Sequence, residues 1–472
     1  MISPATRAKY RTTVGIECHV QLKTKTKLFS AAGNDAREAP PNTLVNHIDF
    51  GLPGALPVLN EAAIELACRV AFALNSQPQK FSKFDRKHYF YPDLPMGYQI
   101  TQYDEPIVVG GQVTIEVNGQ PKTVGITRAH LEADAGKNTH HAGQDYSLVD
   151  LNRAGTPLLE IVSEPDMHSS AEAKAYAREL YLLMRYADVS DANLYYGNMR
   201  FDVNVSVSPD EKLGTRSETK NLNSFRAVEK AVDYEVTRQI ERLEKGERIV
   251  QETRGWDDAK QKTFSQRDKE NADDYRYMPD PDLPPVILDD KYIEKIKAAM
   301  LKLPKDIRQE LSKFDISPEV IEDILDNPQI YQKLSAAIND NIAPENIRRI
   351  AYDSLEKPET LKIRLEDHVK VAESLRVQAS SSTSASYALE VLLEDPDKNV
   401  DDLLKENAQV SDEGEITKIV EQVITDNPKA AEDVKNGEMK AIGFLVGQVM
   451  KASQGKANPS LAQDLIKKRL GL

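Results

Sequence analysis

The sequence has few of the residues that would tie a protein to an oxidising compartment or to a membrane. Its 472 residues include only two cysteines, Cys18 and Cys68. Both lie in apolar patterns, which indicates reduced thiols rather than a disulfide framework. No apolar run approaches the length of a membrane span, and Met1 to Tyr10 holds no apolar signal core. We therefore expect a cytoplasmic protein with no membrane partner.

Readable nucleotide motifs and an excess of positive charge are also missing. No segment reads G-x-x-x-x-G-K-[ST], and no G-x-G-x-x-G follows a predicted strand. The 75 acidic residues outnumber the 61 lysines and arginines, which gives a net charge of −14. This balance excludes a protein that coats nucleic acid through charge alone, although it leaves a local basic surface open.

The length exceeds what one core can hold, and the texture of the sequence changes twice along the chain. Residues 1–290 are rich in strands, with helical spacing at 61–74, 171–186 and 227–245, which indicates an α+β domain. Asp280 to Pro285 ends this region with successive prolines. We predict a strand-rich catalytic domain at 1–290, an all-helical domain at 291–402 and a small helical tail domain at 403–472. Within the helical region, Ser317-Pro318 and Asn327-Pro328 mark helix starts, and Ser380 to Ser386 predicts a polar hinge or loop.

Four segments alternate apolar and polar residues as strands do: 14–22, 126–135, 156–162 and 200–208. A strand side chain points the same way every second residue, so each segment has one polar face. The residues on these faces are Glu17, His19, Gln21, Arg128, His130, Glu132, Asp134, Glu160, Arg200, Asp202, Asn204 and Ser206. If the four strands share one curved sheet, their polar faces line one cavity whose carboxylates suit a hard cation such as Mg²⁺.

An antiparallel sheet with one wet face would give the same alternation without any site. Two features argue against this simpler interpretation. The polar positions hold carboxylates, imidazoles and arginine rather than threonine and lysine. Glu160 also lies in an apolar run with no lysine nearby in sequence, and a buried, unpaired carboxylate is costly unless it binds a cation or shares a proton.

The segment from Lys83 to Asp104 interleaves basic and aromatic residues inside an acidic protein. One interpretation is a phosphate clamp of Lys83, Arg86 and Lys87, with Tyr89 and Tyr91 beside a base or a ribose. The alternative is a solvated loop whose tyrosines brace the sheet.

Several segments of the sequence resemble those of a known family. The segments K-F-D-R-K-H-Y-F-Y-P-D (83–93), D-L-N-R-A-G-T-P-L-L-E-I-V-S-E-P-D (150–166), E-T-K-N-L-N-S-F (218–225), Q-E-T-R (251–254) and D-Y-R-Y-M-P-D-P-D-L-P-P (274–285) are similar to those of the B subunits of aspartyl/glutamyl-tRNA amidotransferases. The C-terminal N-G-E-M-K-A-I-G-F-L-V-G-Q-V-M-K-A-S-Q-G-K-A-N-P is similar to their tail domain, so the resemblance spans residues 11–472.

The resemblance implies a cradle-shaped catalytic domain, a helical domain and a helical tail. It implies a ligase that uses ATP to phosphorylate the side-chain carboxylate of Glu-tRNA(Gln) or Asp-tRNA(Asn), after which ammonia displaces the phosphate. A separate amidase subunit releases the ammonia from glutamine, and a small clamp subunit completes a heterotrimer. The serine and lysine signature of an amidase is absent here, as that division of labour requires.

The resemblance also implies roles for particular residues. It places a metal site at Glu17, His19, Glu132 and Glu160, with Lys87 beside it at the mouth of the ammonia route, so that Lys87 and Glu132 are the catalytic pair. Histidine is unusual for Mg²⁺, so either His19 holds a ligated water or the ion is softer, such as Mn²⁺. We expect contacts to the nucleotide or the tRNA acceptor end at Lys83, Arg86, Tyr89, Tyr91, Asp202, Arg216, Glu218 and Lys220.

Three positions depart from the family's pattern. Ala133 stands where a second glutamate is frequent, Met96 replaces a common lysine, and Phe201 replaces a frequent cysteine. Ala133 puts support of the metal ligands in doubt, and Met96 weakens a phosphate role for its loop.

The tail carries cations at Lys440, Lys451, Lys456, Lys467 and Lys468. A basic end on an acidic protein indicates contact with an RNA backbone, and Gly443 and Gly447 would form a strip without side chains on a helix spanning 439–450. The alternative for Lys467 and Lys468 is that they complement a helix dipole.

Two other functions remain open from the sequence. A non-catalytic tRNA-binding scaffold would keep the fold without the chemistry, and a glycoside hydrolase would use a carboxylate pair without ATP. Neither accounts for both the ligand set and the basic, aromatic segment.

Overall fold

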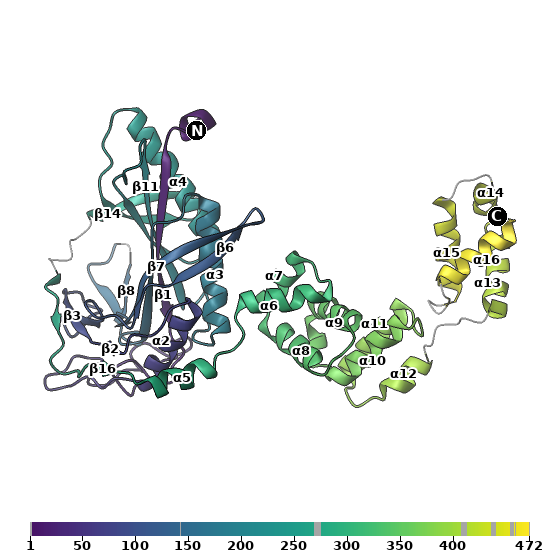
Figure 1. Ribbon diagram of the computed structural model, residues 1–472, viewed down its shortest axis with the longest axis horizontal. Helices are drawn as coiled ribbons and strands as arrows, with labels where there is room; N and C mark the ends of the chain where they lie inside the picture. The colour runs from purple at the N-terminus through teal and green to yellow at the C-terminus, as the bar shows by residue number, and fades with distance from the viewer. Residues whose placement is uncertain are drawn as a thin grey trace. The chain divides into compact units, whose positions relative to one another are not determined.

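A computed structural model describes residues 2–141, 143–268, 275–406, 413–435, 440–453, 457 and 459–471. The chain divides into two compact units, residues 1–304 and 305–472 (Figure 1). The first unit extends past the boundary predicted at 290, because helix α5 (Asp290–Ala298) buries Ile293 and Ile296 in the core of that unit.

A large mixed sheet organises the first unit, as the alternating segments predicted. The strand order is β14-β13-β12-β11-β1-β10-β7-β4-β3-β15, and β5 and β6 both pair with β7. The strands are β1 (Arg11–Gln21), β3 (Asp85–His88), β4 (Tyr98–Thr101), β5 (Val108–Val109), β6 (Gln112–Val117), β7 (Gln120–Ala133), β10 (Pro157–Ser163), β11 (Met199–Ser208), β12 (Ser217–Leu222), β13 (Glu252–Asp257), β14 (Lys262–Asp268) and β15 (Met278–Pro279).

The four predicted strands are neighbours in this sheet, in the order β11-β1-β10-β7, and each adjacent pair is antiparallel. His19 lies opposite Arg200 on one side and opposite Glu160 on the other. Glu160 in turn lies opposite His130. The register therefore brings the polar faces of the four strands into one continuous surface, as predicted.

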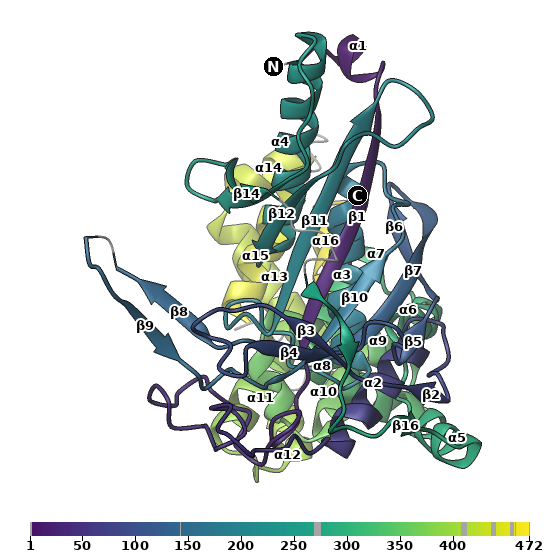
Figure 2. The same ribbon diagram turned by 90° about the vertical axis from the view of Figure 1, so that its left-hand side faces the viewer.

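Helices cover the apolar face of this sheet. They are α2 (Glu61–Ala73), α3 (Ser170–Tyr186) and α4 (Phe225–Glu244), and Figures 1 and 2 show α3 and α4 running together along the long strands. Asn60, Ser169 and Ser224 cap their N-termini by accepting a hydrogen bond from the first turn. Ile16 and Cys18 are fully buried in the core that these helices form with the sheet. Phe201 is buried there too, so the family's cysteine has been exchanged for a core aromatic rather than for a site residue.

Smaller elements decorate the first unit. They are α1 (Pro4–Arg7), the pair β2 (Phe81–Ser82) with β16 (Val286–Ile287), and the hairpin of β8 (Lys137–His140) with β9 (Ser147–Asp150).

The second unit is helical, as predicted. Its elements are α6 (Pro304–Leu311), η2 (Ser312–Phe314), α7 (Pro318–Asp326), α8 (Pro328–Asn339), α9 (Pro344–Glu356), η3 (Pro358–Lys362), α10 (Leu365–Arg376), α11 (Ser382–Glu394), α12 (Val400–Glu406), α13 (Glu413–Asp426), α14 (Pro428–Lys435), α15 (Lys440–Ala452) and α16 (Pro459–Leu470). Ser317 and Asn327 cap α7 and α8, which confirms the two predicted starts. No helix among the described residues is long and apolar enough to cross a membrane.

Two expectations for this unit are wrong in detail. Residues 380–386 are not a hinge, because Ser381 caps α11 by accepting from the backbone N–H of Ser384, and the helix begins at Ser382. The boundary predicted after residue 402 falls inside α12, since Val400 and Leu403 both pack into the core formed by α10 and α11. A separate core joins the helices from α13 to α16.

Candidate functional site

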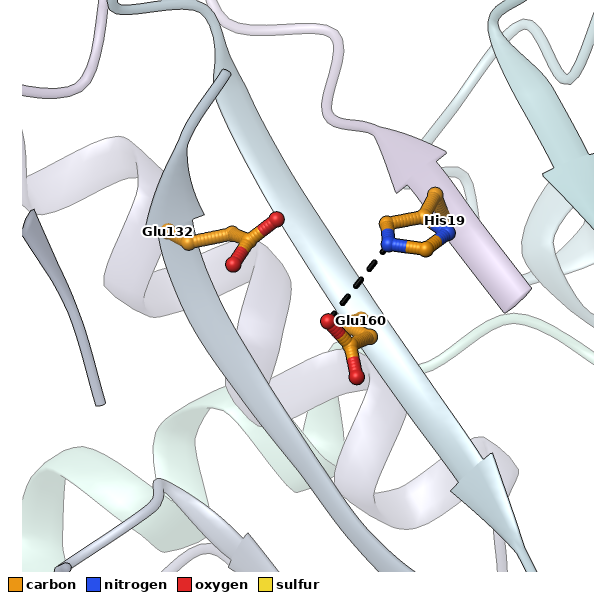
Figure 3. A group of neighbouring side chains, drawn as sticks. All are labelled: His19, Glu132 and Glu160. Carbon is orange, nitrogen blue, oxygen red and sulfur yellow. Dashed lines mark ion pairs between the residues drawn. The ribbon is translucent and has the colours of Figure 1, made fainter. Parts of the chain in front are cut away.

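Three of the four predicted metal ligands meet on the polar face of the sheet. His19 comes from β1, Glu160 from β10 and Glu132 from β7, and one ligand atom of each lies within 4.8 Å of the others. Figure 3 shows the His19 ring and the two carboxylates directed into the same space, with the His19 Nε2 3.4 Å from the Glu160 Oε2. We call these three residues the first cluster.

His19 and Glu160 of the first cluster each stabilise the charged form of the other. Burial opposes the charged form of His19, but the hydrogen bond to Glu160 and the charges of Glu160 and Asp202 outweigh it and raise the pKa of His19 to about 9. Burial likewise opposes ionisation of Glu160, yet the charge of His130, the hydrogen bond from His19 and the charge of Lys87 hold its pKa well below the usual range. Glu160 is therefore an ionised carboxylate in a buried site, which is the state that a cation requires.

His130 belongs to the same surface, although we did not predict it as a site residue. It is 4% exposed, and its Nε2 lies 3.7 Å from the Glu160 Oε2 and 3.8 Å from the Glu132 Oε2. Its Nδ1 is buried and has no hydrogen-bond partner among the described residues. The signal was present in the sequence, because His130 shares the polar parity of Glu132 and Asp134.

Glu17, the fourth predicted ligand, lies in a different group. It forms a second cluster with Asp202 and Glu218, whose ligand atoms also lie within 4.8 Å of one another. The register explains the separation. Glu17 precedes His19 by two residues on β1 and lies opposite Asp202 of β11. Glu218 of β12 lies opposite Asn204 of β11. Two neighbouring clusters therefore share the same face, and Glu17 groups with the second.

The second cluster is held by donors on the strands around it. Asn204 donates to Glu17 at 3.0 Å, and Thr253 donates to Glu218 at 3.1 Å. Lys220 donates to Asp202 at 3.1 Å and lies 3.4 Å from Glu218. Burial disfavours the Lys220 ammonium, but Asp202 and Glu218 outweigh burial and raise its pKa. Lys220 therefore offsets part of the negative charge, and the three carboxylates still exceed it.

A cavity of about 530 Å³ opens beside the second cluster. Glu17 forms part of its lining, and Gly15 leaves its floor without a side chain. Hydroxyl, amide and apolar groups and one guanidinium supply the rest, namely Thr13, Ile16, Thr127, Val162, Ser163, Pro165, Asn204, Ser206, Leu213, Gly214, Thr215, Arg216 and Gln251. Arg216 is exposed, so its guanidinium is accessible to an anion that enters this cavity.

The predicted phosphate clamp is not assembled from its three cations. Arg86 donates to Asp280 at 2.9 Å and to Asp282 at 2.8 Å, and Lys83 donates to Asp104 at 3.0 Å. Both side chains are therefore paired with carboxylates. Lys87 alone faces the first cluster, where its charge helps to lower the pKa of Glu160.

Aromatic side chains surround Lys87. Its Nζ lies 4.7 Å from the ring centroid of Tyr275 and 5.9 Å from that of Tyr89. Tyr275 and Tyr277 were not predicted, although both lie in a segment that carried the resemblance. Tyr91, which was predicted beside a base or a ribose, is 56% exposed.

Asp134 pairs with neighbouring side chains and belongs to neither cluster. It lies 3.3 Å from the Arg200 Nη2 and 3.4 Å from the Arg153 Nε, and it accepts from Gln21 at 3.2 Å. These partners satisfy its charge at the end of the polar surface. Ala133 next to it is buried among apolar residues, so this chain has no side chain there to support the first cluster.

The cations predicted to bind tRNA in the tail differ in exposure. Lys440, Lys451 and Lys468 are exposed and Lys467 is half-buried, whereas Lys456 lies outside the described residues. Arg469 pairs with Glu421, which supports a structural role for the end of α16. Gly443 and Gly447 are exposed, and a Cβ at either would meet nothing within 4 Å. The predicted open strip is therefore present on α15.

The donor atoms of both clusters fit divalent cations. The second cluster offers only carboxylate oxygens, which match the preference of Mg²⁺. The first cluster adds an imidazole, which suits Mn²⁺ or an Mg²⁺ that keeps part of its water shell.

Comparison with known proteins agrees with this arrangement. Residues 12–294 match the family described as GatB/GatE catalytic domain, and residues 331–470 match the GatB domain. Three similar relatives, each named as the B subunit of an aspartyl/glutamyl-tRNA(Asn/Gln) amidotransferase, come from Caldicellulosiruptor saccharolyticus, Alkalilimnicola ehrlichii and Geobacillus kaustophilus. They are 43%, 44% and 43% identical to this chain, and each alignment covers 98% of the chain and 99% of the relative. The chain therefore belongs to the family of B subunits of tRNA-dependent aspartyl/glutamyl amidotransferases.

Proposed function

We propose that this chain activates and amidates the side-chain carboxylate of Glu-tRNA(Gln), Asp-tRNA(Asn) or both, as an ATP-dependent carbon–nitrogen ligase. The observation that carries the proposal is the pair of clusters on one sheet face, with a nucleotide-sized cavity beside the second and a lysine beside the first. Activation of a carboxylate by ATP needs cationic charge at both the transferred phosphoryl group and the acceptor.

The reaction has two steps that balance. First, a carboxylate oxygen of the aminoacyl side chain attacks the terminal phosphorus of ATP, so that an O–P bond forms and ADP leaves. Second, ammonia attacks the carbonyl carbon, a C–N bond forms, and phosphate leaves with the loss of one proton from nitrogen. Glutamine supplies the ammonia on this proposal, through hydrolysis in another subunit.

The nucleotide fits the cavity beside the second cluster. A volume of about 530 Å³ lies within the range of small-molecule sites, and the lining offers both apolar walls and hydroxyl donors. Arg216 at the rim and Lys220 in the cluster supply positive charge for phosphate oxygens. ATP would thus be held without a glycine-rich phosphate loop, which agrees with the absence of that motif from the sequence.

Divalent cations would be held by Glu17, Asp202 and Glu218 and by His19, Glu132 and Glu160, where they would neutralise charge on the phosphates and on the substrate carboxylate. The chain's own cation at the first cluster is Lys87, whose ammonium stabilises negative charge that develops on the carbonyl and phosphate oxygens. Glu132 faces the same space and is the group that accepts a proton from the attacking nitrogen.

The family name implies a complex of several subunits, and one surface suits an apolar partner. Phe50, Leu52, Leu56, Phe90 and Tyr91 are each between 42% and 78% exposed. A Cβ at Gly51 would meet the backbone of Pro95 and Met96, and a Cβ at Gly97 would meet the Phe90 ring, so the two loops adjoin. Exposed apolar area of this kind marks a docking surface, and Phe90 and Tyr91 follow Lys87 and Tyr89 directly in sequence. We place the ammonia-producing subunit here, with a small clamp subunit completing the heterotrimer.

The test uses the purified complex of this chain with its partner subunits. Glu-tRNA(Gln) and Asp-tRNA(Asn) are supplied separately with ATP and either glutamine or ammonium chloride. We expect ATP-dependent formation of the amide on at least one tRNA with both nitrogen sources. ATP consumption that is indifferent to the charged tRNA, or absence of the amide with both tRNAs, would overturn the proposal and favour a binding scaffold.

A further inference from the structure

The residues around Lys87 form a continuous aromatic layer that the proposed chemistry has not used. The rings of Tyr103 and Tyr277 stack with centroids 3.9 Å apart and an angle of 9° between their planes. Tyr277 meets Tyr275 edge to face at 6.1 Å, and Tyr275 meets Tyr89 in the same way at 6.3 Å. We call these four tyrosines the aromatic wall.

The aromatic wall borders the first cluster rather than a remote surface. In the sheet β3 pairs with β4 and β4 pairs with β7, so that Lys87 lies opposite Gln99 and Thr101 opposite Glu132. Burial and then the charges of Glu132 and Glu160 raise the pKa of Tyr277. Burial and then the charge of Glu132 raise the pKa of Tyr89 in the same manner. The Lys87 ammonium lies over the face of Tyr275, in the geometry of a cation–π contact.

Long-range contacts hold Tyr275 and Tyr277 in place. β15 pairs with β3, so that Met278 lies opposite Arg86, and the Asp280 N–H donates to the Phe84 carbonyl at 2.9 Å. The Arg86 guanidinium fastens the same segment through Asp280 and Asp282, and the His88 Nδ1 lies 3.0 Å from the Arg276 carbonyl oxygen. Arg86 therefore fixes the two tyrosines against the site.

We propose that Tyr275 and Tyr277 complete a wall that holds the Lys87 ammonium over the carboxylate cluster and keeps water from the activated substrate carboxylate. This inference rests on the proposed function. An acyl phosphate reacts with water as well as with ammonia: water forms a new C–O bond, phosphate leaves, and the original carboxylate returns with the loss of a proton. Each such event consumes one ATP without making an amide, so a site that admits water loses coupling.

The experiment measures ATP consumed per amide formed, in the complex of this chain with its partner subunits. Ammonium chloride serves as the nitrogen source, so that the delivery of ammonia from glutamine does not limit the reaction. We expect Tyr277→Ala and Tyr275→Ala to raise the ratio of ATP consumed to amide formed by about tenfold or more, because water then reaches the carbonyl carbon. Tyr277→Phe and Tyr275→Phe should keep the wild-type ratio, since the ring faces remain.

Tyr195→Ala is the matched control, because Tyr195 is 89% exposed and takes no part in the proposed site. If an alanine variant fails to fold, Tyr277→Leu and Tyr275→Leu retain bulk without an aromatic face. Tyr275→Leu should then lower amide formation, because the Lys87 ammonium loses the ring that it lies over. Tyr277→Leu should keep the wild-type ratio of ATP consumed to amide formed. Alanine variants that lose both activities equally, with an unchanged ratio, would overturn the inference and leave the tyrosines a bracing role. Phenylalanine variants as uncoupled as the alanine variants would also overturn it, since the hydroxyl would then matter instead of the ring. Wild-type protein that forms no ATP-dependent amide would refute the proposed function itself.

Discussion

Replacement of Glu160 by glutamine is the sharpest test of the first cluster. The substitution keeps the shape of the side chain and removes the one charge that His19, His130 and Lys87 all face. If Glu160 helps to hold a cation and to place the substrate carboxylate, amide formation should fall by about 10²–10³-fold, which is roughly 2.7–4 kcal/mol of transition-state stabilisation. The affinity for Mn²⁺ should fall in the same variant by at least about tenfold.

The effect on stability should be small at neutral pH, which separates a functional loss from unfolding. Breaking a buried ion pair costs about 3–5 kcal/mol when it strands an uncompensated charge. His19 escapes most of that cost, because without Glu160 the largest of the causes that raise its pKa is gone, and burial then favours the neutral imidazole. Both side chains of the pair are also about 15% exposed, which reduces the penalty further.

The assays are amide formation, Mn²⁺ titration and thermal melting of the same preparations. Glu164→Gln is the matched control: Glu164 follows β10, is exposed, and its carboxylate accepts from the Thr127 hydroxyl. Wild-type turnover and unaltered Mn²⁺ affinity in Glu160→Gln would refute the assignment of the cluster. An equal loss of amide formation in Glu164→Gln would show that any charge change near β10 lowers activity. The specific role of Glu160 in the first cluster would then be refuted.

Three further predictions address the catalytic lysine, the support of the second cluster and the tail. Lys87→Ala should abolish amide formation with little change in the melting temperature, because Lys87 stabilises charge at the site; turnover at the wild-type rate with saturating ATP and glutamine would reject that role. Glu235→Gln should lower the free energy of unfolding by about 3 kcal/mol in urea titrations at neutral pH, because Glu235 is fully buried and compensates Arg238 and Arg254 behind β12. Burial opposes ionisation of Glu235, but Arg238 and the hydroxyls of Ser217 and Thr263 lower its pKa in the folded state. The contribution of Glu235 to stability is therefore complete above the unfolded pKa of about 4.3 and is lost as the pH falls through the lower folded pKa. The free energies of unfolding of the wild type and Glu235→Gln should consequently converge in acid. A chain ending after α12 should bind tRNA more weakly and with a shallower salt dependence, by about 0.9 of a logarithmic unit for each phosphate that the tail no longer neutralises, and equal slopes for both lengths would show that the tail's lysines serve its helices alone.

Local periodicity was sufficient to predict the polar surface. The alternation in β1, β7, β10 and β11 depends only on the pleat of each strand, and the register of one strand against the next places those faces together. Parity placed His19, Glu132 and Glu160 on this surface, and the family resemblance singled them out as metal ligands. The grouping of Glu17 with Asp202 and Glu218 was not predicted, because the sequence does not state which cross-strand neighbour each residue meets.

Contacts between distant parts of the chain account for the remaining differences. Arg86 resembles a phosphate ligand in its own segment, yet its partners Asp280 and Asp282 lie almost two hundred residues further along. The same docking brings Tyr275 and Tyr277 to Lys87, which no local pattern could show. The serines at 380–386 were misjudged for a different reason: serine favours both loops and helix starts, and only the backbone of α11 decides between them.

On the proposed function, the two clusters serve different steps of the reaction. Glu17 and His19 are two residues apart on β1, so their Cα atoms are separated by about 7 Å. On the proposed function, the nucleotide occupies the cavity lined by β1 with parts of β7, β10 and β11, and ammonia arrives from the β3 side, where Lys87 and the aromatic wall lie. Ammonia then need not wait for ADP to leave, because the two groups approach the substrate carboxylate by separate routes. Variants of the second cluster should consequently depress ATP consumption and amide formation together, whereas variants of the wall should depress the amide alone. A wall variant that slowed phosphorylation, measured as ADP formed in a single turnover without ammonia, would contradict this separation of the two halves of the site.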